Sequence, residues 1–257
     1  MRITYRNKNN KDYWNNRWED IPTDEPMINK DAYPLKYSEM LIKNGDGSIL
    51  EAGCGNGRIL RYYHNQGCDI IGFDFIEIAI NQLKEIDPTL RVEVGNITKL
   101  RFENESFNLL LAFGLYHNLE NGLEDAVGET HRVLKSNGLI CASFRADNIQ
   151  NRLTDWLTDR RSETLRNDEP RVFHKMNLTK NEFSSLFIRN GFEVENIFPA
   201  ENMPILYKFA FFRAKSHKDF NEYIARREGY KLSVLGKIIQ NILMKHFPNQ
   251  FCNIYVI

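Results

Sequence analysis

The sequence has few cysteines, and none of them is paired closely with another. Over 257 residues there are four, Cys54, Cys68, Cys141 and Cys252, and no two are separated by only two residues. This spacing supplies neither the disulfide framework of a small secreted domain nor the ligand pairs of a zinc site. We therefore expect free thiols, no bound metal and a reducing, cytoplasmic environment.

Long apolar runs are also missing. No uninterrupted apolar segment approaches the ~20 residues that an α-helix needs to cross a bilayer. The first residues, Met-Arg-Ile-Thr-Tyr-Arg-Asn-Lys, are polar and lack the hydrophobic segment of a secretion signal. We expect a soluble protein.

Neither sign of charge is in excess. Lys and Arg total 34, and Asp and Glu also total 34, so the formal net charge is zero. A balanced chain lacks the general attraction to phosphates on which non-specific nucleic-acid binding depends, so we expect no nucleic-acid partner. The 42% hydrophobic and 26% charged content is that of an ordinary globular protein, which excludes a disordered chain.

Between residues 48 and 145, short apolar segments alternate with segments of helical periodicity. The strand-like segments are residues 48–53, 68–74, 91–94, 107–113 and 139–144. Apolar positions recur at helical spacing between them, most clearly after Gly122. This alternation predicts an α/β fold with a parallel sheet and helices on both faces.

The remaining chain is less regular. Thr179 and Glu182 form a capping-box pattern, residues 192–198 alternate like a strand, and residues 251–257 are apolar. No repeat and no Gly/Ser linker interrupts the chain. We predict one domain, with an N-terminal cap segment (1–44), a core (45–145) and an elaboration (146–257).

A glycine-rich turn follows the first strand-like segment of the core. Gly53, Gly55 and Gly57 stand in a GxGxG pattern, whereas the dinucleotide fingerprint requires GxGxxG and a P-loop requires Gly-Lys-Ser/Thr. Glycine lets a ligand lie against bare backbone, and a helix N-terminus offers free N–H groups. Asp74 ends the next strand, where a carboxylate can bind both hydroxyls of a ribose or cap the following helix before Ile76.

These features resemble the class I S-adenosylmethionine-dependent methyltransferases, in particular their small-molecule branch. The similar segments, in the family's order, are residues 50–57, 71–74, 95–97, 113–118 and 132–138. The resemblance implies a Rossmann-like, doubly wound seven-stranded sheet of order 3-2-1-4-5-7-6, with strand seven antiparallel and helical insertions. It also implies S-adenosyl-L-methionine as the cofactor.

The same resemblance implies which residues hold the cofactor. Those residues are Tyr13, Arg17, Glu51, Gly53, Cys54, Gly55, Gly57, Asp74, Phe75, Asn96, Ile97 and Phe113. Glu51 and the glycine turn would bind the methionine end, Asp74 the ribose, and Asn96 with the Ile97 backbone the adenine edge. Phe75 and Phe113 would line the pocket. The segment containing Tyr13 and Arg17 would fold over the cofactor or simply pack as an aromatic helix on the core.

Methyl transfer from a sulfonium needs alignment and a dry pocket more than it needs a nucleophile. His117 is the candidate base for a hydroxyl acceptor, because an unperturbed histidine pKa near ~6.5 suits that role. A histidine that only packs beside Tyr116 is the alternative. Phe113 stands where the Mg²⁺-dependent catechol type has a carboxylate, so we predict metal-independent methylation of oxygen or nitrogen, with oxygen preferred.

The aromatic and basic segment 200–246 contains an apolar helical stripe at 234–246. It predicts either a helix packed over the sheet or a lid for a sugar- or lipid-linked acceptor, with peripheral membrane contact through 234–246. The predicted function is methyl transfer to a small molecule or glycoconjugate. The alternatives are a non-catalytic S-adenosylmethionine-binding scaffold or regulator and, with less support, an NAD-linked oxidoreductase.

Overall fold

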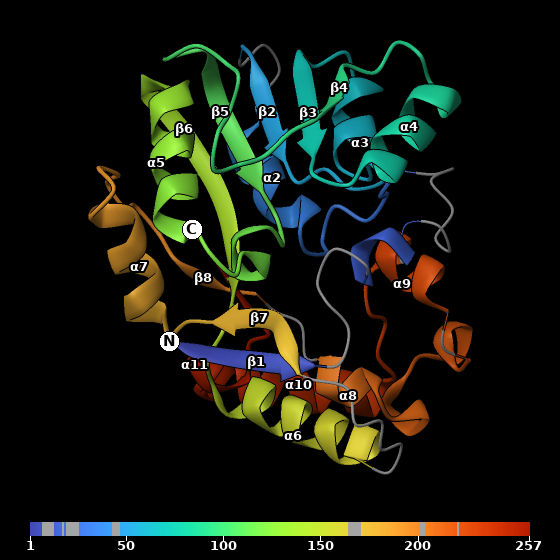
Figure 1. The fold of residues 1–257 in the computed structure, drawn as a ribbon. Coiled ribbons are helices and arrows are strands. Elements are labelled where there is room, and N and C mark those ends of the chain that lie inside the picture. Colours follow the sequence, from blue (N-terminus) through green and yellow to red (C-terminus); the bar gives the residue numbers. More distant parts are fainter. Residues whose placement is uncertain are drawn as a thin grey trace.

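The computed structural model describes residues 1–6, 13–16, 18, 26–42, 47–163, 171–200, 204–219 and 221–257. Its central feature is a seven-stranded sheet of order β4-β3-β2-β5-β6-β9-β8 (Figure 1). The strands are β2 (Ile49–Ala52), β3 (Ile70–Asp74), β4 (Val92–Val94), β5 (Phe107–Ala112), β6 (Leu134–Arg145), β8 (Phe198–Pro199) and β9 (Ile254–Val256). In chain order this is 3-2-1-4-5-7-6, and β9 is antiparallel to both neighbours, so the predicted topology is confirmed.

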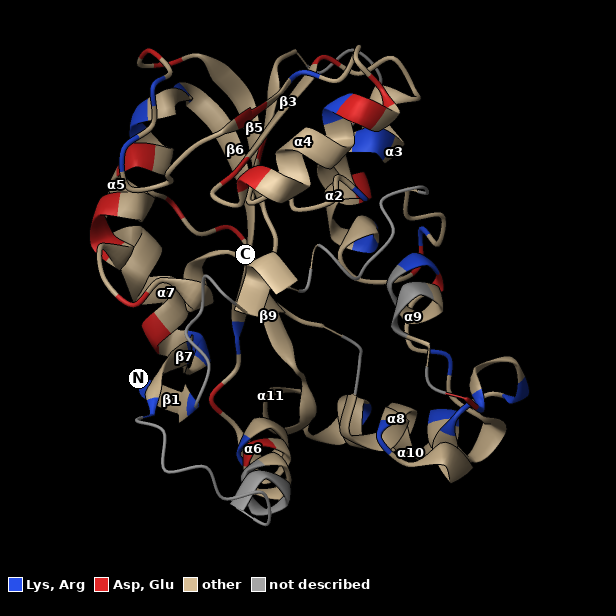
Figure 2. Cartoon of the chain, turned by 45° about the vertical axis from the view of Figure 1, so that its right-hand side comes forward, with Lys and Arg blue, Asp and Glu red and all other residues tan. Residues whose placement is uncertain are grey.

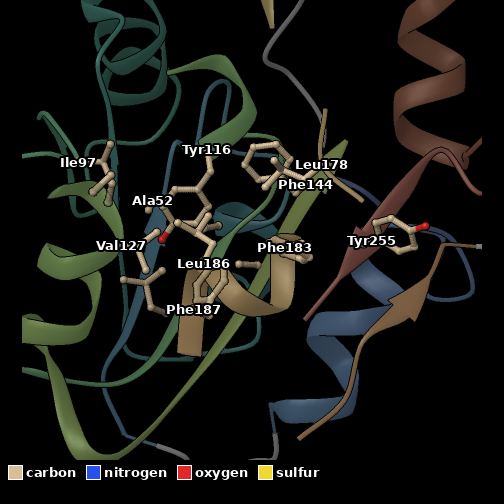
Figure 3. Close-up of a cluster of buried hydrophobic side chains, with 14 of the residues drawn as sticks. Ala52, Ile97, Tyr116, Val127, Phe144, Leu178, Phe183, Leu186, Phe187 and Tyr255 are labelled. Carbon is tan, nitrogen blue, oxygen red and sulfur yellow. The ribbon is translucent and has the colours of Figure 1, made fainter. Parts of the chain in front are cut away.

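Helices cover both faces of this sheet. They are α2 (Leu35–Leu41), α3 (Leu60–His64), α4 (Glu77–Ile86), α5 (Leu123–Val133) and α7 (Lys180–Ile188). Side chains of α2, α3 and α4 pack into the core on one face. Those of α5 and α7 pack into the core on the other, where Tyr116, Phe144, Phe183 and Phe187 lie together (Figure 3). Every residue of β2 is buried, as a strand covered on both faces requires.

Local sequence signals explain where two of these helices begin. In α7 the predicted capping box is present, because Thr179 Oγ1 accepts from the Glu182 N–H while Glu182 accepts from the Thr179 N–H. Glu124 and Asp125 lie in the first turn of α5, next to the positive end of its dipole. The residue at the N-cap of α5 is Gly122, whose φ of 72° is left-handed.

Strand lengths differ from the predictions at the antiparallel end of the sheet. The alternating residues 192–198 contribute only the two-residue β8, and the apolar C-terminal segment begins as helix α11 (Pro248–Phe251) before β9. In contrast, β6 has 12 residues and begins at Leu134, well before the predicted position 139. Pairing partners account for these lengths, since β6 lies between β5 and β9 whereas β8 is an edge strand.

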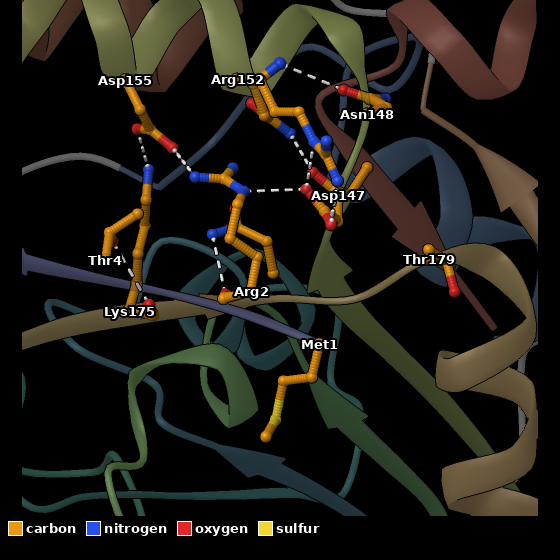
Figure 4. Close-up of polar contacts among 12 residues, drawn as sticks. Met1, Arg2, Thr4, Asp147, Asn148, Arg152, Asp155, Lys175 and Thr179 are labelled. Carbon is orange, nitrogen blue, oxygen red and sulfur yellow. Dashed lines mark hydrogen bonds and ion pairs between the residues drawn. The ribbon is translucent and has the colours of Figure 1, made fainter.

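A second, two-stranded sheet was not predicted. β1 (Arg2–Arg6) pairs antiparallel with β7 (Val172–Asn177), beside α6 (Ile149–Glu163) (Figure 1). An ion-pair cluster joins them: Arg2 contacts Asp147 and Asp155, each at 2.8 Å, and Lys175 contacts Asp155 at 2.9 Å (Figure 4). These charges are partly or fully buried, so their mutual pairing offsets the cost of removing them from water.

The C-terminal elaboration has its own small core. It contains α8 (Pro204–Tyr207), η2 (Ala210–Phe212), η3 (Lys215–His217), α9 (Glu222–Glu228) and α10 (Val234–His246). Ile205, Leu206 and Leu232 are buried there, with Ile239 and Leu243 of α10 packed against them. In the described segments, including α10, no helix combines the length and apolar composition needed to cross a bilayer.

Candidate active site

A cavity of about 1010 Å³ lies where the carboxyl ends of β2, β3, β5 and β6 meet. This edge of a doubly wound sheet, at the point where the strand order reverses, is where ligands bind in such folds. The predicted site residues that line it are Glu51, Gly53, Cys54, Gly55, Asp74, Phe75, Asn96, Ile97, Phe113 and His117. Tyr13 and Gly57 do not line it, and Arg17 lies outside the described residues.

The glycine turn is held tightly in place. Gly53 and Cys54 both donate their N–H groups to the Phe73 carbonyl of the adjacent strand, at 2.8 and 3.0 Å. Gly55 has a φ of 53°, and a Cβ on it would lie 2.6 Å from Cζ2 of Trp18. Gly57 instead faces α4, where a Cβ would lie 2.7 Å from Leu83 Cδ2. The third glycine therefore permits close helix packing and does not touch the cavity.

Asp74 connects the glycine turn with the start of α4. Its Oδ2 accepts the Gly55 N–H at 2.8 Å and its Oδ1 accepts the Ile76 N–H at 2.9 Å. Burial raises the pKa of this carboxyl, while the backbone hydrogen bonds from Ile76 and Gly55 oppose the increase. Because a carboxylate has about four lone-pair sites, Asp74 can also accept from hydroxyl groups in the cavity. The predicted ribose and helix-start roles of Asp74 are compatible.

Glu51 is a buried acid at the end of β2. Burial raises its pKa to about 8, and this increase is opposed by the nearby Arg58 and by a hydrogen bond from the Leu60 backbone. Its Oε2 has no hydrogen-bond partner among the described residues. An unpartnered carboxylate oxygen beside a cavity fits a ligand that carries a positive charge, and S-adenosylmethionine has both an ammonium and a sulfonium group.

The part of the cavity predicted to hold the adenine is more exposed to solvent than the part around Glu51 and Asp74. Phe75 is 55% exposed and lines the cavity, and Phe113 lies edge-on to Tyr33 with ring centroids 5.9 Å apart. Asn96 Oδ1 accepts both the N–H and the hydroxyl of Thr98, each at 3.0 Å. The Asn96 amide is thus left with donors to offer a ligand, so it suits a ring nitrogen of adenine better than the exocyclic amino group.

Two tryptophans of the N-terminal segment, Trp14 and Trp18, line the cavity. The sequence had instead predicted cofactor contacts by Tyr13 and Arg17. Trp14 and Trp18 stack with ring centroids 5.5 Å apart, and Trp18 covers Gly55. Tyr13 instead packs edge-on against His174, which removes it from the cavity wall. The cluster of aromatic residues between positions 13 and 18 indicated that this segment packs on the core or the cofactor. Their spacing does not predict which ring faces the glycine turn.

His117 lies in η1 (Tyr116–Asn118) and is only 7% exposed. Burial lowers its pKa well below the ordinary value, and the nearby Arg145, Lys175 and His174 lower it further. The expectation of an ordinary histidine pKa is therefore wrong, because a charged imidazole is disfavoured at this buried, cationic position. At neutral pH His117 is uncharged and available to accept a proton, although as a weak base.

Beyond His117 the cavity continues between Tyr33 and the C-terminal elaboration. The Tyr33 hydroxyl contacts Ser143 Oγ at 2.8 Å, and Ser143 Oγ also accepts the Gly114 N–H at 3.0 Å. Arg145 donates to Asn253 Oδ1 at 2.8 Å and has no ion-pair partner among the described residues. No motif indicated these residues, because they come from separate segments that only the fold brings together.

Part of the chain is similar to known methyltransferases. Residues 50–142 match the family described as "Methyltransferase domain". A probable S-adenosylmethionine-dependent methyltransferase of Mycolicibacterium smegmatis is 26% identical over 164 residues, 64% of this chain and 59% of that protein. A demethylmenaquinone methyltransferase of Leptospira interrogans is 32% identical over 126 residues, covering 45% of this chain and 49% of that protein.

A solved structure, the S-adenosylmethionine-dependent methyltransferase of Methanosarcina mazei, has the same fold. Its TM-score is 0.55 at 19% identity, and the match covers 66% of this chain and 88% of that one. The chain spans about half the length of the curated relatives it matches. Residues 50–142, the segment similar to the methyltransferase-domain family, contain the glycine turn, Asp74 and His117. The Mycolicibacterium smegmatis and Methanosarcina mazei proteins that the chain resembles are both named as S-adenosylmethionine-dependent methyltransferases.

Proposed function

We propose that this protein transfers a methyl group from S-adenosylmethionine to an oxygen or nitrogen of a small molecule or glycoconjugate, without a metal. The observation that carries the proposal is the shared cavity, which is lined by Gly53, Gly55, Asp74 and Glu51. The Oε2 of Glu51 has no hydrogen-bond partner among the described residues. The cavity volume of about 1010 Å³ is at the upper end of the roughly 300–1,000 Å³ usual for ligand pockets. A cavity of this size can hold an acceptor molecule beside the cofactor.

The bound cofactor supplies an activated methyl group, which an acceptor atom displaces in line. In this proposal the chain contributes alignment and exclusion of water. Gly53 and Gly55 provide bare backbone for the methionine end, Asp74 orients the ribose, and Trp18 shields the turn from solvent. The acceptor lies on the Tyr33 side, within reach of His117.

The acceptor region favours oxygen chemistry. His117 is neutral, and its Nδ1 is without a hydrogen-bond partner among the described residues. A neutral imidazole can take the proton that a hydroxyl acceptor loses. Arg145 lines the same wall and has no acidic partner in the part of the chain that the structure describes, which suits an acceptor that also carries negative charge.

Calorimetric titration tests the cofactor assignment. S-adenosylmethionine and S-adenosylhomocysteine should bind with one site per chain, while NAD should not bind measurably. Binding of NAD alone would support the oxidoreductase alternative. If S-adenosylmethionine binds but labelled methyl groups never reach any component of a source-cell extract, the protein is the non-catalytic scaffold or regulator.

Replacing His117 by alanine should lower turnover on the order of tenfold, less than a base with a well-matched pKa contributes. The reduced effect follows from its low pKa, which makes it a weak base. Single-turnover kinetics and calorimetry on the same sample measure the rate and the cofactor affinity separately. His64→Ala is the matched control, because His64 does not line the cavity. Equal turnover of His117→Ala and the native protein would show that His117 only packs beside Phe144.

A further inference from the structure

The C-terminal elaboration exposes an unusual amount of apolar surface. On α10, Val234 is 77% exposed and Ile242 is 53% exposed. The other exposed large apolar side chains of this part are Phe209, Phe211, Tyr230, Leu235, Ile238 and Phe247. Val234, Ile238 and Ile242 recur every four residues, so they form one strip along the helix. Exposed apolar residues scattered singly are ordinary, but a continuous strip indicates a binding surface.

This strip is distinct from the face that holds α10 to the molecule. Ile239 and Leu243 face inward and pack against the small core around Ile205 and Leu206. At the start of α10, Ser233 donates its N–H to the Phe212 carbonyl at 2.7 Å, which brings the exposed Phe211 next to Val234. The apolar surface therefore continues from α10 onto η2.

The charge around the strip is strongly positive, although the whole chain is neutral. Between residues 204 and 246 the sequence has nine Lys and Arg but only three Asp and Glu. Figure 2 shows Lys and Arg on α10 and on the connections around it, while several Asp and Glu lie on α5. Lys245 lies on α10 and is exposed, and Lys215 and Lys218 are also exposed.

We propose that residues 204–247 dock this protein on an anionic lipid bilayer, with the apolar strip at headgroup depth and the lysines against acidic headgroups. An apolar helix face rimmed by cations is the pattern that binds such surfaces reversibly. A neutral protein partner would not need the surrounding excess of positive charge. The occupant is therefore a lipid surface, and not a second copy of a chain with the same positive patch.

The docking surface adjoins the cavity. Tyr230, Lys231, Lys237 and Gln240 line the cavity from the elaboration. If the proposed methyl transfer is correct, the acceptor is an amphiphile that enters from the bilayer side and presents its polar end to His117. This last step rests on the proposed function, whereas the docking itself does not.

Co-sedimentation with vesicles tests the docking. The full chain should bind vesicles of phosphatidylcholine with 30% phosphatidylglycerol, and should bind pure phosphatidylcholine about tenfold or more weakly, because each basic residue near an acidic surface adds to the attraction. Raising the salt to about 0.5 M should also weaken binding, since salt screens exposed charges.

Two variants separate the apolar and the charge contributions. Ile238→Asn with Ile242→Asn, and Lys215→Glu with Lys245→Glu, should each reduce binding about tenfold. Ile188→Asn and Lys84→Glu are the matched controls, because Ile188 is 56% exposed on α7 and Lys84 is exposed on α4. Both controls should bind like the native protein. Unchanged S-adenosylmethionine affinity in all four shows that each variant is folded.

Absence of vesicle binding by a protein that still binds S-adenosylmethionine would overturn the docking and leave the proposed function intact. A dimer seen by light scattering that the Ile238/Ile242 variant abolishes, without vesicle binding, would assign the strip to a second copy. Binding that is equal for neutral and anionic vesicles would reject the electrostatic part. Vesicle binding without S-adenosylmethionine binding would instead contradict the proposed function alone.

Discussion

Replacing Glu51 by glutamine should remove a pH-dependent loss of stability. In the folded protein burial raises the pKa of Glu51 from an ordinary value of 4.5 to about 8. Below pH 4.5 the carboxyl is protonated in both the folded and unfolded states, so it has no differential effect. Between pH 4.5 and about 8 the unfolded chain loses the proton and the folded chain keeps it, so the free energy of unfolding falls as the pH rises.

The size of this effect follows from the difference in pKa. One pKa unit corresponds to about 1.4 kcal/mol, so the loss by pH 8 is on the order of 4–5 kcal/mol. Glu51→Gln has nearly the same shape and no charge, and should be more stable than the native protein at pH 8 but not at pH 4.5. Urea unfolding of the cofactor-free protein across this range measures the difference. Parallel stability profiles for the two proteins would contradict the prediction.

A matched control and a ligand readout strengthen this test. Glu85→Gln, at an exposed position on α4, should leave the pH profile unchanged. Because a positive group beside Glu51 would favour its charged form, binding of S-adenosylmethionine near pH 7 should release a proton. Binding enthalpies in buffers of different ionisation enthalpy count that proton, and Glu51→Gln should abolish its release.

Replacing Asp74 by alanine should weaken S-adenosylmethionine binding about 100-fold. The variant removes the acceptor of the Gly55 and Ile76 N–H groups and also the proposed contacts to the ribose. Losing charged hydrogen bonds of this kind costs on the order of 2–3 kcal/mol. Asp74→Asn keeps one acceptor oxygen and should lose only about tenfold, because its amide nitrogen cannot accept a backbone N–H.

Calorimetry measures both affinities. Asp69→Ala is the matched control, since Asp69 directly precedes the same strand, is exposed and does not line the cavity. It should bind the cofactor like the native protein. An Asp74→Ala protein that is folded by circular dichroism and binds within about threefold of native affinity would remove Asp74 from the site.

The central residues of the candidate cofactor site were predictable because they lie close together along the chain or at fixed strand ends. Gly53, Gly55 and Asp74 were recognised from spacing, and parallel strands bring their carboxyl ends to one edge of the sheet. The role of Gly57 was not predictable in this way. Its spacing is identical to that of a ligand-contacting glycine, and only the position of Leu83 distinguishes the two.

The low pKa of His117 could not be predicted from local sequence patterns. Its pKa depends on burial and on cations delivered by β6 and β7, namely Arg145 and Lys175. The pairing of β1 with β7 joins residues more than 160 positions apart, and no local propensity specifies such a partner. The packing of Trp18 over Gly55 likewise brings together residues that no local pattern pairs.

The sequence by itself determined the α/β architecture, the strand order that its resemblance to a known family implied, and the glycine turn at the end of β2. Hydrophobic periodicity, capping residues and glycine spacing are local properties, so they can be recognised in a short segment without knowledge of its tertiary contacts. Only the tertiary structure decided which residues share the cavity, that Glu51 is buried with one carboxyl oxygen unpaired among the described residues, and which face of α10 stays exposed. These depend on burial and on charges from distant segments, because solvation and electrostatic energies are set by neighbours in space.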